Sequence, residues 1–235
     1  MRVEKIGLAT LYLGDCREII GELEARSVAA VITDPPYGIN TKSDGSGKLS
    51  PWADLCNAAF WYADWLASCR RLVGADGCVW SFLNWRSIPT FQKAACDMRW
   101  SIESLLVWDK EWIGPGGMRG LRPSYEMVAL FAGEDFSIED RGLPDIRRAK
   151  WSSIKPHGHP AEKPEDLISW LVQISTKPGG VVVDPFMGSG TTGAAAVKVH
   201  RPFVGVEMDP EWFEIACRRI EEAQRQGDMF RDAVA

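Results

Sequence analysis

Short apolar runs that each end near an acidic residue recur along this chain, and stretches with helical periodicity separate them. The clearest runs are residues 28–32, 181–183 and 203–206, followed by Asp34, Asp184 and Glu207. Such runs are typical of buried strands, and their alternation with amphipathic helices predicts a mostly parallel, doubly wound α/β sheet. Sheets of this kind bind ligands outside the carboxyl ends of their strands, so the residues after these runs are the first functional candidates.

The whole chain fits this pattern. We expect strands at 7–13, 28–33, 78–83, 102–108, 125–132, 181–183 and 203–206. We expect helices at 17–23, from Pro51 to about 74, at 87–98, from Pro164 to about 174, one that continues through 194–199, and one at 210–224. Residues 38–50 predict a mobile loop, because glycine, serine and lysine dominate them. With 235 residues the chain is expected to form one domain, 1–235, in which 133–158 have no clear period.

The composition excludes several classes of protein. Hydrophobic residues make up 46% and charged residues 25%, which is typical of a soluble protein with a real core. No run is long enough to span a membrane and no signal peptide is visible, so we expect no membrane partner. The six cysteines form no Cys-x-x-Cys pair, which predicts reduced thiols and a cytoplasmic protein. A net charge of −5 argues against non-specific binding to nucleic acid but allows a local basic face.

Asp34-Pro35-Pro36-Tyr37 follows the first of these strands and carries the strongest chemical signal. The two prolines fix φ and remove two backbone donors, so this corner offers hydrogen-bond acceptors. Acceptors beside a flat ring suit a planar group that carries an exocyclic NH2. An ordinary strand-ending turn is the alternative, because Asp and Pro are common in turns.

A glycine turn follows the strand at 181–183 and opens a helix. Gly188 and Gly190 permit a tight turn and a close approach of a ligand to the backbone. The free N–H groups of the helix start favour an anionic group. The side chains beside them are Ser189, Thr191 and Thr192. No lysine follows the second glycine, so this is not a Walker loop. Glu207 ends the next strand, where a carboxylate can accept hydrogen bonds from ribose hydroxyls. Together these residues predict a site for a nucleoside with a carboxylate tail, such as S-adenosylmethionine.

These two segments and their order resemble the amino-methyltransferases of DNA, which methylate exocyclic nitrogens of adenine or cytosine. Asp-Pro-Pro-Tyr comes first and Phe-x-Gly-x-Gly roughly 150 residues later, an order similar to the permuted β group of bacterial and phage enzymes. Further matching segments are 14–16, 121–126, 159–164 and 205–209. The resemblance covers nearly the whole chain and implies a Rossmann-like, S-adenosylmethionine-dependent methyltransferase fold in the cytoplasm of a bacterium or phage host.

The resemblance implies roles for the catalytic corner. Asp34 and the Pro35 carbonyl would accept the two hydrogens of the amino group, beside Pro36, and Tyr37 would stack on the base. The base must first be flipped out of the duplex. Sequence leaves open whether Asp34 takes up the proton or only positions the amine.

The resemblance also implies a cofactor pocket. Asp15 and Cys16 would meet the adenine of S-adenosylmethionine, and Glu207 the ribose, with Met208 and Asp209 beside it. Phe186 and the backbone of 188–190, with Ser189 and Asp184, would hold the methionine end. Thr191, Thr192 and Lys163 are candidates for its carboxylate, although Lys163 at a helix start could equally be solvated.

Double-stranded DNA is the expected partner, and it needs local positive charge. Candidate contacts are Lys42, Lys48, Arg119, Arg122, Arg147, Arg148 and Lys150. The resemblance places the target-recognition region at 133–158. This region is short, which favours either a short recognition sequence or a homodimer. A cognate restriction nuclease would be a further partner.

Several alternatives remain open at this stage. Enzymes that methylate cytosine N4 usually have Ser where Asp34 stands, so Asp favours adenine. A catalytically silent DNA-binding or regulatory module is an alternative from another class. His157 and His159 lack nearby cysteines, so we expect no metal. Trp85 or Trp108, near strand ends, could line the pocket of a flipped base.

Overall fold

The computed structural model describes residues 2–36, 55–114, 120–152, 157–159 and 161–232, with the side chains of 55–61 and 227–232 excepted. Its strands are β1 (Arg2–Ile6), β2 (Ala9–Leu13), β3 (Val28–Thr33), β4 (Val73–Leu83), β5 (Ser104–Asp109), β6 (Tyr125–Ala132), β7 (Ile146–Arg148), β8 (Val182–Asp184) and β9 (Phe203–Glu207). Its helices are α1 (Cys16–Glu22), α2 (Leu55–Leu72), α3 (Ile88–Asp97), α4 (Glu165–Ser175), α5 (Thr191–Lys198) and α6 (Pro210–Asp232).

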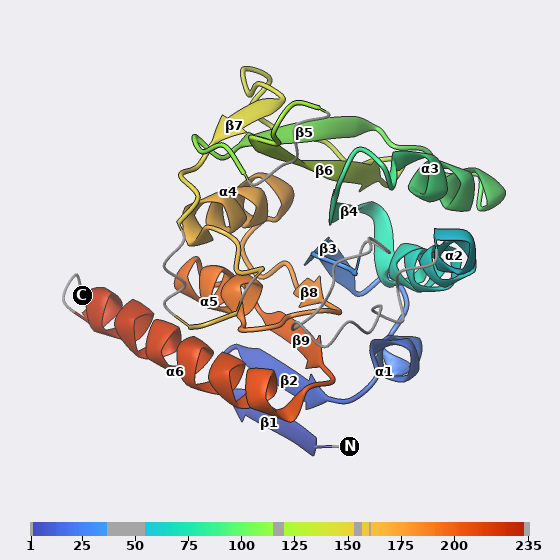
Figure 1. The fold of residues 1–235 in the computed structure, drawn as a ribbon. Helices are drawn as coiled ribbons and strands as arrows, with labels where there is room; N and C mark the ends of the chain where they lie inside the picture. Colours follow the sequence, from blue (N-terminus) through green and yellow to red (C-terminus); the bar gives the residue numbers. More distant parts are fainter. Residues whose placement is uncertain (1, 37–54, 115–119, 153–156, 160, 233–235) are drawn as a thin grey trace.

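All these strands join one sheet in the order β1-β2-β9-β8-β3-β4-β6-β5-β7 (Figure 1). The central pairs β2–β9, β9–β8, β8–β3 and β3–β4 are parallel, as is β5–β7. The pairs β1–β2, β4–β6 and β5–β6 are antiparallel. The prediction of a mostly parallel α/β sheet is therefore confirmed, and the antiparallel pairs lie outside its centre.

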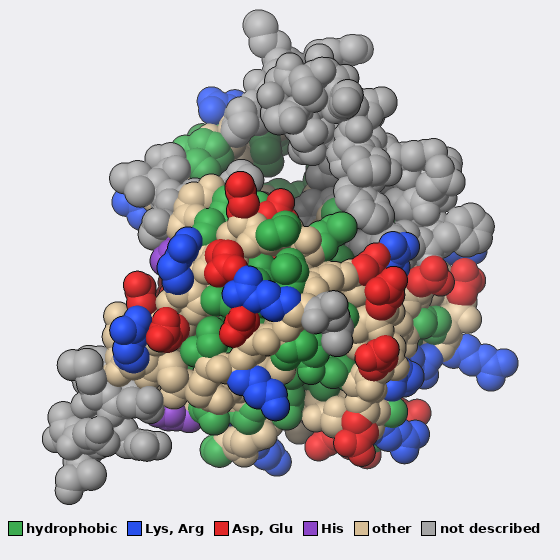
Figure 2. All heavy atoms as spheres, turned by 90° about the horizontal axis from the view of Figure 1, so that it is seen from below, with side chains coloured by type: hydrophobic (Ala, Val, Ile, Leu, Met, Phe, Trp, Pro, Cys, Tyr) green, Lys and Arg blue, Asp and Glu red, His purple; other side chains and the backbone are tan. Residues whose placement is uncertain are grey.

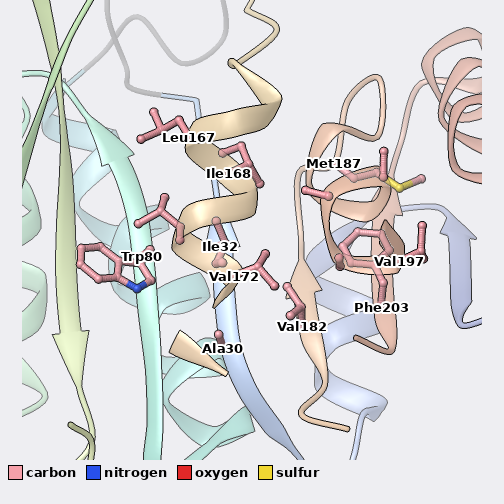
Figure 3. Packing of buried hydrophobic residues seen from close by; sticks show 14 of the residues in the cluster. Ala30, Ile32, Trp80, Leu167, Ile168, Val172, Val182, Met187, Val197 and Phe203 are labelled. Carbon is pink, nitrogen blue, oxygen red and sulfur yellow. The ribbon is translucent and has the colours of Figure 1, made fainter. Parts of the chain in front are cut away.

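Helices cover both faces of this sheet. The α1, α2 and α3 helices pack on one face, while α4, α5 and α6 pack on the other (Figure 1). Alternate residues of β3 face the two layers: Val31 joins the α2 side and Ile32 the α4 side. On the latter side Leu167 and Ile168 of α4 lie close to Ile32 (Figure 3). Burial on both faces explains why β3 is continuously apolar.

Two strands were not predicted. Both β1 and β7 are edge strands with exposed and half-buried residues, so neither contains an apolar run. The β7 strand attaches the 133–158 region to the sheet through parallel pairing with β5. The assignment of 133–158 to target recognition stays a prediction, as does the single-domain boundary. Among the helices of the described ranges, none is long and apolar enough to cross a membrane.

Candidate active site

The acidic strand ends predicted from sequence meet at one edge of the sheet. In the middle of the sheet β3 lies beside β8, with Ala30 opposite Val182 and Val31 opposite Val183. The β9 strand lies on the far side of β8. Because all three strands run parallel, the segments that follow them emerge side by side. Asp34, Asp184 and Glu207 consequently line a common pocket of about 310 Å³.

This pocket connects the Asp34 corner to the glycine turn. The strand-ending residues Thr33, Asp34, Pro35 and Pro36 line it. Its lining also includes Asp184, Phe186, Met187, Gly188, Ser189, Thr191 and Thr192. A second pocket, of about 140 Å³, is lined by Asp15, Cys16 and Met208 and shares Phe186 and Glu207 with the first. The two pockets therefore adjoin, and together they suit an elongated ligand.

Asp184 joins the two halves of the site through hydrogen bonds. Its buried carboxylate accepts from Thr33 Oγ1 at 2.7 Å, from Thr192 Oγ1 at 2.7 Å and from the Phe186 amide at 3.0 Å. Burial raises the pKa of Asp184 to about 6, despite the hydrogen bonds from Thr192, Thr33 and Phe186 that favour its charged form. Asp184 thus connects the end of β3 to the start of α5.

The raised pKa of Asp184 predicts a pH effect on stability. In the folded protein the Asp184 carboxyl group stays protonated up to about pH 6, whereas its ordinary pKa is 3.8. Between these values the folded state holds more protons than the unfolded state, so the contribution of Asp184 to the free energy of unfolding falls as pH rises. We expect Asp184→Asn to remove this slope. Urea unfolding of both proteins from pH 4 to pH 7 measures it, and parallel pH profiles would contradict the expectation.

The glycine turn has little space around it. Gly188 and Gly190 have φ of 50° and 80°, a left-handed region that favours glycine. A Cβ at position 190 would lie 2.9 Å from the Cβ of Ala216, so the turn is pressed against α6. The amide of Gly188 donates to Glu207 Oε2 at 2.9 Å, and the amide of Asp209 donates to Oε1 at 2.8 Å. Burial raises the pKa of Glu207.

The ring of Phe186 packs against another aromatic side chain. Its ring makes an edge contact with buried Trp65 of α2, with centroids 6.0 Å apart. Phe186 lines both pockets, so the position of its ring determines the boundary between them.

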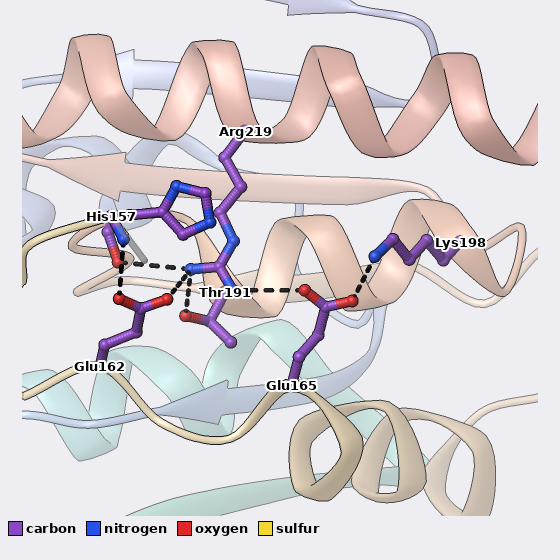
Figure 4. Close-up of polar contacts among 7 residues, drawn as sticks. His157, Glu162, Glu165, Thr191, Lys198 and Arg219 are labelled. Carbon is purple, nitrogen blue, oxygen red and sulfur yellow. Dashed lines mark hydrogen bonds and ion pairs between the residues drawn. The ribbon is translucent and has the colours of Figure 1, made fainter. Parts of the chain in front are cut away.

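Arg219 of α6 is a site residue that the sequence did not predict. Its guanidinium is buried and donates from Nη1 to Glu162 Oε1 and to Thr191 Oγ1, both at 2.8 Å (Figure 4). From Nη2 it donates to Glu165 Oε2 at 3.3 Å. Glu162 and Thr191 both line the larger pocket. Arg219 therefore connects α6 to the glycine turn and to the segment before α4.

The structure gives Lys163 a position that the sequence did not predict. Its ammonium lies 2.5 Å from Asp34 Oδ2 and 3.2 Å from Glu126 Oε2. Lys163 therefore pairs with the catalytic candidate Asp34, and this pairing differs from the expected contact with the methionine carboxylate. Its side chain is only 10% exposed, so the alternative of a solvated lysine is wrong.

Two other predicted cofactor contacts belong to helix starts. Asp15 caps α1 by accepting from the Arg17 amide at 2.9 Å, and it pairs with the Arg17 side chain at 2.6 Å. Asp15 still lines the smaller pocket, as expected. Asp209 accepts from the amide of Glu211 at the start of α6 at 2.8 Å, and it lines neither pocket. Asp209 therefore caps α6, which explains why an acid stands there, and its contact with the cofactor stays a prediction.

The predicted DNA contacts are spread over several segments. The Arg122 side chain donates to the Gly114 carbonyl at 2.8 Å and so holds a loop. The guanidinium of Arg147 lies 4.9 Å from the ring centroid of Trp170, and Arg148 pairs with Asp109 at 3.5 Å. Lys150 is exposed. Tyr37, Lys42, Lys48 and Arg119 lie outside the described residues.

The two tryptophans that were candidates for the pocket of a flipped base have different environments. Trp108 is buried, and its indole nitrogen donates to the Ala149 carbonyl at 2.7 Å, so Trp108 does not line the pocket. Trp85 is 60% exposed.

Figure 2 shows acidic and basic side chains interspersed on the face that carries β1 and α6, so that face is not the basic surface that DNA requires.

No group of three metal-ligating side chains occurs within the ranges that the structure describes. The ring of His159 makes an edge contact with Trp212, with centroids 4.6 Å apart, and the backbone N–H of His157 faces Glu162 Oε2 at 3.4 Å. The absence of a metal remains a prediction.

Comparisons with known proteins support a common family for this architecture. A family model described as DNA methylase matches residues 28–218. DNA adenine methyltransferase YhdJ of Escherichia coli (strain K12) is 27% identical over 252 residues, which cover 91% of this chain and 83% of that protein. Type II methyltransferase M2.MboI of Moraxella bovis is 26% identical over 241 residues, which cover 90% of this chain and 87% of that protein.

Solved structures agree with these relatives. The crystal structure of the M1.HpyAVI-SAM complex has a TM-score of 0.67 at 26% identity and covers 90% of this chain and 99% of that one. The cytosine-N4-specific PvuII DNA methyltransferase has a TM-score of 0.76 at 18% identity, with 95% and 92% covered. At that identity the second likeness shows the fold alone. The predicted Rossmann-like α/β fold is confirmed.

Proposed function

The chain belongs to the DNA methylase family of N6-adenine and N4-cytosine methyltransferases, and within it we propose a site-specific enzyme that methylates adenine N6. The methyl donor is S-adenosylmethionine, on which this family depends. The observation that carries the proposal is that Asp34 lines the same pocket as Gly188 and Ser189 of the glycine turn. A methyl acceptor at Asp34 and a methyl donor on the turn would therefore face each other.

The acid at position 34 favours adenine over cytosine. Among the DNA amino-methyltransferases that the sequence resembles, enzymes that act on cytosine N4 usually have Ser at this position. The relative from Escherichia coli is a DNA adenine methyltransferase by name. Cytosine-N4 methylation is the second candidate, because a cytosine-N4-specific enzyme shares the fold.

The proposed reaction needs positioning more than it needs acid or base chemistry. The lone pair of N6 is delocalised into the adenine ring, so the amine is a poor nucleophile. Asp34 would accept one N6–H and the Pro35 carbonyl the other, which directs the lone pair at the methyl group. The nitrogen forms a bond to the methyl carbon, the carbon–sulfur bond breaks, and its electron pair neutralises the sulfonium. Alignment of the two reactants can supply several kcal/mol of the barrier.

We assign the cofactor to the two adjoining pockets. The adenine of S-adenosylmethionine would occupy the smaller one, against Asp15, Cys16 and Met208. Glu207 lines both pockets and would bind the ribose, while its carboxylate accepts hydrogen bonds from the amides of Gly188 and Asp209. The methionine end would lie along the glycine turn, whose amides at the start of α5 suit a carboxylate.

An assay of the methylated base tests this proposal. The protein is incubated with radiolabelled S-adenosylmethionine and unmethylated duplex DNA, and the DNA is digested to nucleosides. We expect the label in N6-methyl-2′-deoxyadenosine. Label in N4-methylcytosine would overturn the adenine assignment, and no label on any DNA would favour a silent DNA-binding module. Sequencing methylated genomic DNA from a host that expresses the chain would give the recognition sequence. A homodimer and a cognate nuclease stay predictions.

A further inference from the structure

We propose that Lys163, supported by Glu126 and Lys110, is a positioning residue that fixes the orientation of the Asp34 carboxylate toward the amino group. This inference rests on the proposed function. It assigns Lys163 to the methyl acceptor, where the sequence had suggested the carboxylate of the methyl donor.

Four side chains of alternating charge form a row that ends at the pocket. Lys110 Nζ lies 2.6 Å from Glu126 Oε1, Lys163 Nζ lies 3.2 Å from Glu126 Oε2, and the same ammonium lies 2.5 Å from Asp34 Oδ2. The exposed fractions of these side chains lie between 10% and 22%. Ion pairs this far from water are screened little, so each charge depends strongly on its neighbour.

The two ammonium groups also lie on aromatic rings. Lys163 Nζ is 4.9 Å from the ring centroid of Phe82, and Lys110 Nζ is 5.0 Å from that of Trp108. The two rings meet edge to face, with centroids 6.5 Å apart. Cation–π contacts of this kind stabilise a desolvated ammonium. The position of Lys163 is therefore fixed by the core of the sheet as well as by its carboxylate partners.

The charge of Lys163 is maintained by its surroundings. Burial alone would lower its pKa, but the carboxylates of Asp34 and Glu126 outweigh burial and raise the pKa above the ordinary value. For Glu126, burial is likewise outweighed by Lys163 and Lys110, and its pKa is lowered. Glu126 and Lys163 consequently stay ionised at neutral pH.

This arrangement bears on how Asp34 would act. Binding of Oδ2 to the ammonium fixes the rotation of the carboxylate and hence the direction in which Oδ1 points. A carboxylate paired with a buried cation accepts a hydrogen bond from the amine, whereas a carboxylic acid would donate one. We therefore infer that Asp34 positions the amino group, and that the proton on the newly methylated nitrogen passes to water after methyl transfer.

Substitution of Lys163 tests the inference. In Lys163→Met we expect kcat to fall about 100-fold, because the carboxylate loses its orientation, while the Kd for S-adenosylmethionine changes less than threefold. Lys163→Arg restores a cation and should recover kcat to within about tenfold of the wild type. Lys93→Met, which removes a 70% exposed lysine paired with Asp97, is the matched control and should leave both quantities unchanged.

The outcomes separate this inference from the proposed function. A weaker cofactor affinity with unchanged kcat at saturating cofactor would overturn the inference and return Lys163 to the methionine carboxylate. Unchanged kcat and affinity would overturn it as well. A wild-type protein that methylates no DNA would overturn both the inference and the proposed function. If Lys163→Met does not fold, Glu126→Gln tests the inference in its place. This substitution should lower kcat without changing the Kd for the cofactor, and an unchanged kcat would overturn the inference.

Discussion

Asp34→Ala is expected to abolish methyl transfer, lowering kcat by at least about 10³-fold, while the protein still binds S-adenosylmethionine. The substitution removes the acceptor that would orient the amine, so the lone pair is no longer directed at the methyl group. Cofactor binding should persist, because the glycine turn is held by Asp184 and Arg219 through contacts that do not include the Asp34 side chain.

Two measurements on the same preparation check this expectation. Transfer of labelled methyl groups to DNA gives kcat, and isothermal titration gives the Kd for S-adenosylmethionine. Asp97→Ala is a suitable control. Asp97 is 63% exposed on α3, and within the described residues its one ion pair is with Lys93. Retained activity in Asp34→Ala would remove Asp34 from the mechanism. Loss of cofactor binding would mean that the two halves of the pocket are not separable.

The second large effect concerns stability. Arg219→Met should lower the free energy of unfolding by about 3–5 kcal/mol, because it removes a buried cation from two carboxylates. The Glu162 side chain is 5% exposed and loses its ion pair with Arg219 at 2.8 Å, while Glu165 keeps its ion pair with Lys198. The same substitution removes a donor from Thr191, so cofactor affinity should fall as well.

The neighbouring residue provides a matched control for this prediction. Arg218 lies on the same helix but is exposed, so Arg218→Met makes the same chemical change without breaking a buried pair. Urea unfolding of the wild type and both variants gives the comparison. A loss below about 1 kcal/mol in Arg219→Met would show that the network around Glu162 is worth no more than a surface ion pair.

The sequence predicted the centre of the sheet far better than its edges. The β3 and β6 strands have the bounds expected for 28–33 and 125–132, because each is a long apolar run with a clear turn after it. The edge strands β1 and β7 consist of Arg-Val-Glu-Lys-Ile and Ile-Arg-Arg, whose charged residues resemble a loop. Edge strands need fewer apolar residues because they bury less of their surface.

The candidate site shows the same division. Asp34, Asp184 and Glu207 could be placed together from sequence, because strand ends in a parallel sheet share an edge. The partners of these residues could not be predicted. Arg219 belongs to a helix in which charged residues are common, and it is the tertiary packing of that helix that buries it against Glu162 and Thr191. The distance between Lys163 and Glu126 likewise depends on tertiary structure.

The adjacency of β3 and β8 has a consequence for how the protein is made. The hydrogen bond from Thr33 to Asp184 spans 151 positions of the chain, and β8 cannot pair with β3 until those residues have been synthesised. During translation one edge of β3 therefore remains without its native neighbour for most of the growth of the chain. Contacts of such long range slow folding and prolong the exposure of aggregation-prone strands. The region around Asp34 would thus be among the last parts of the protein to reach its final geometry.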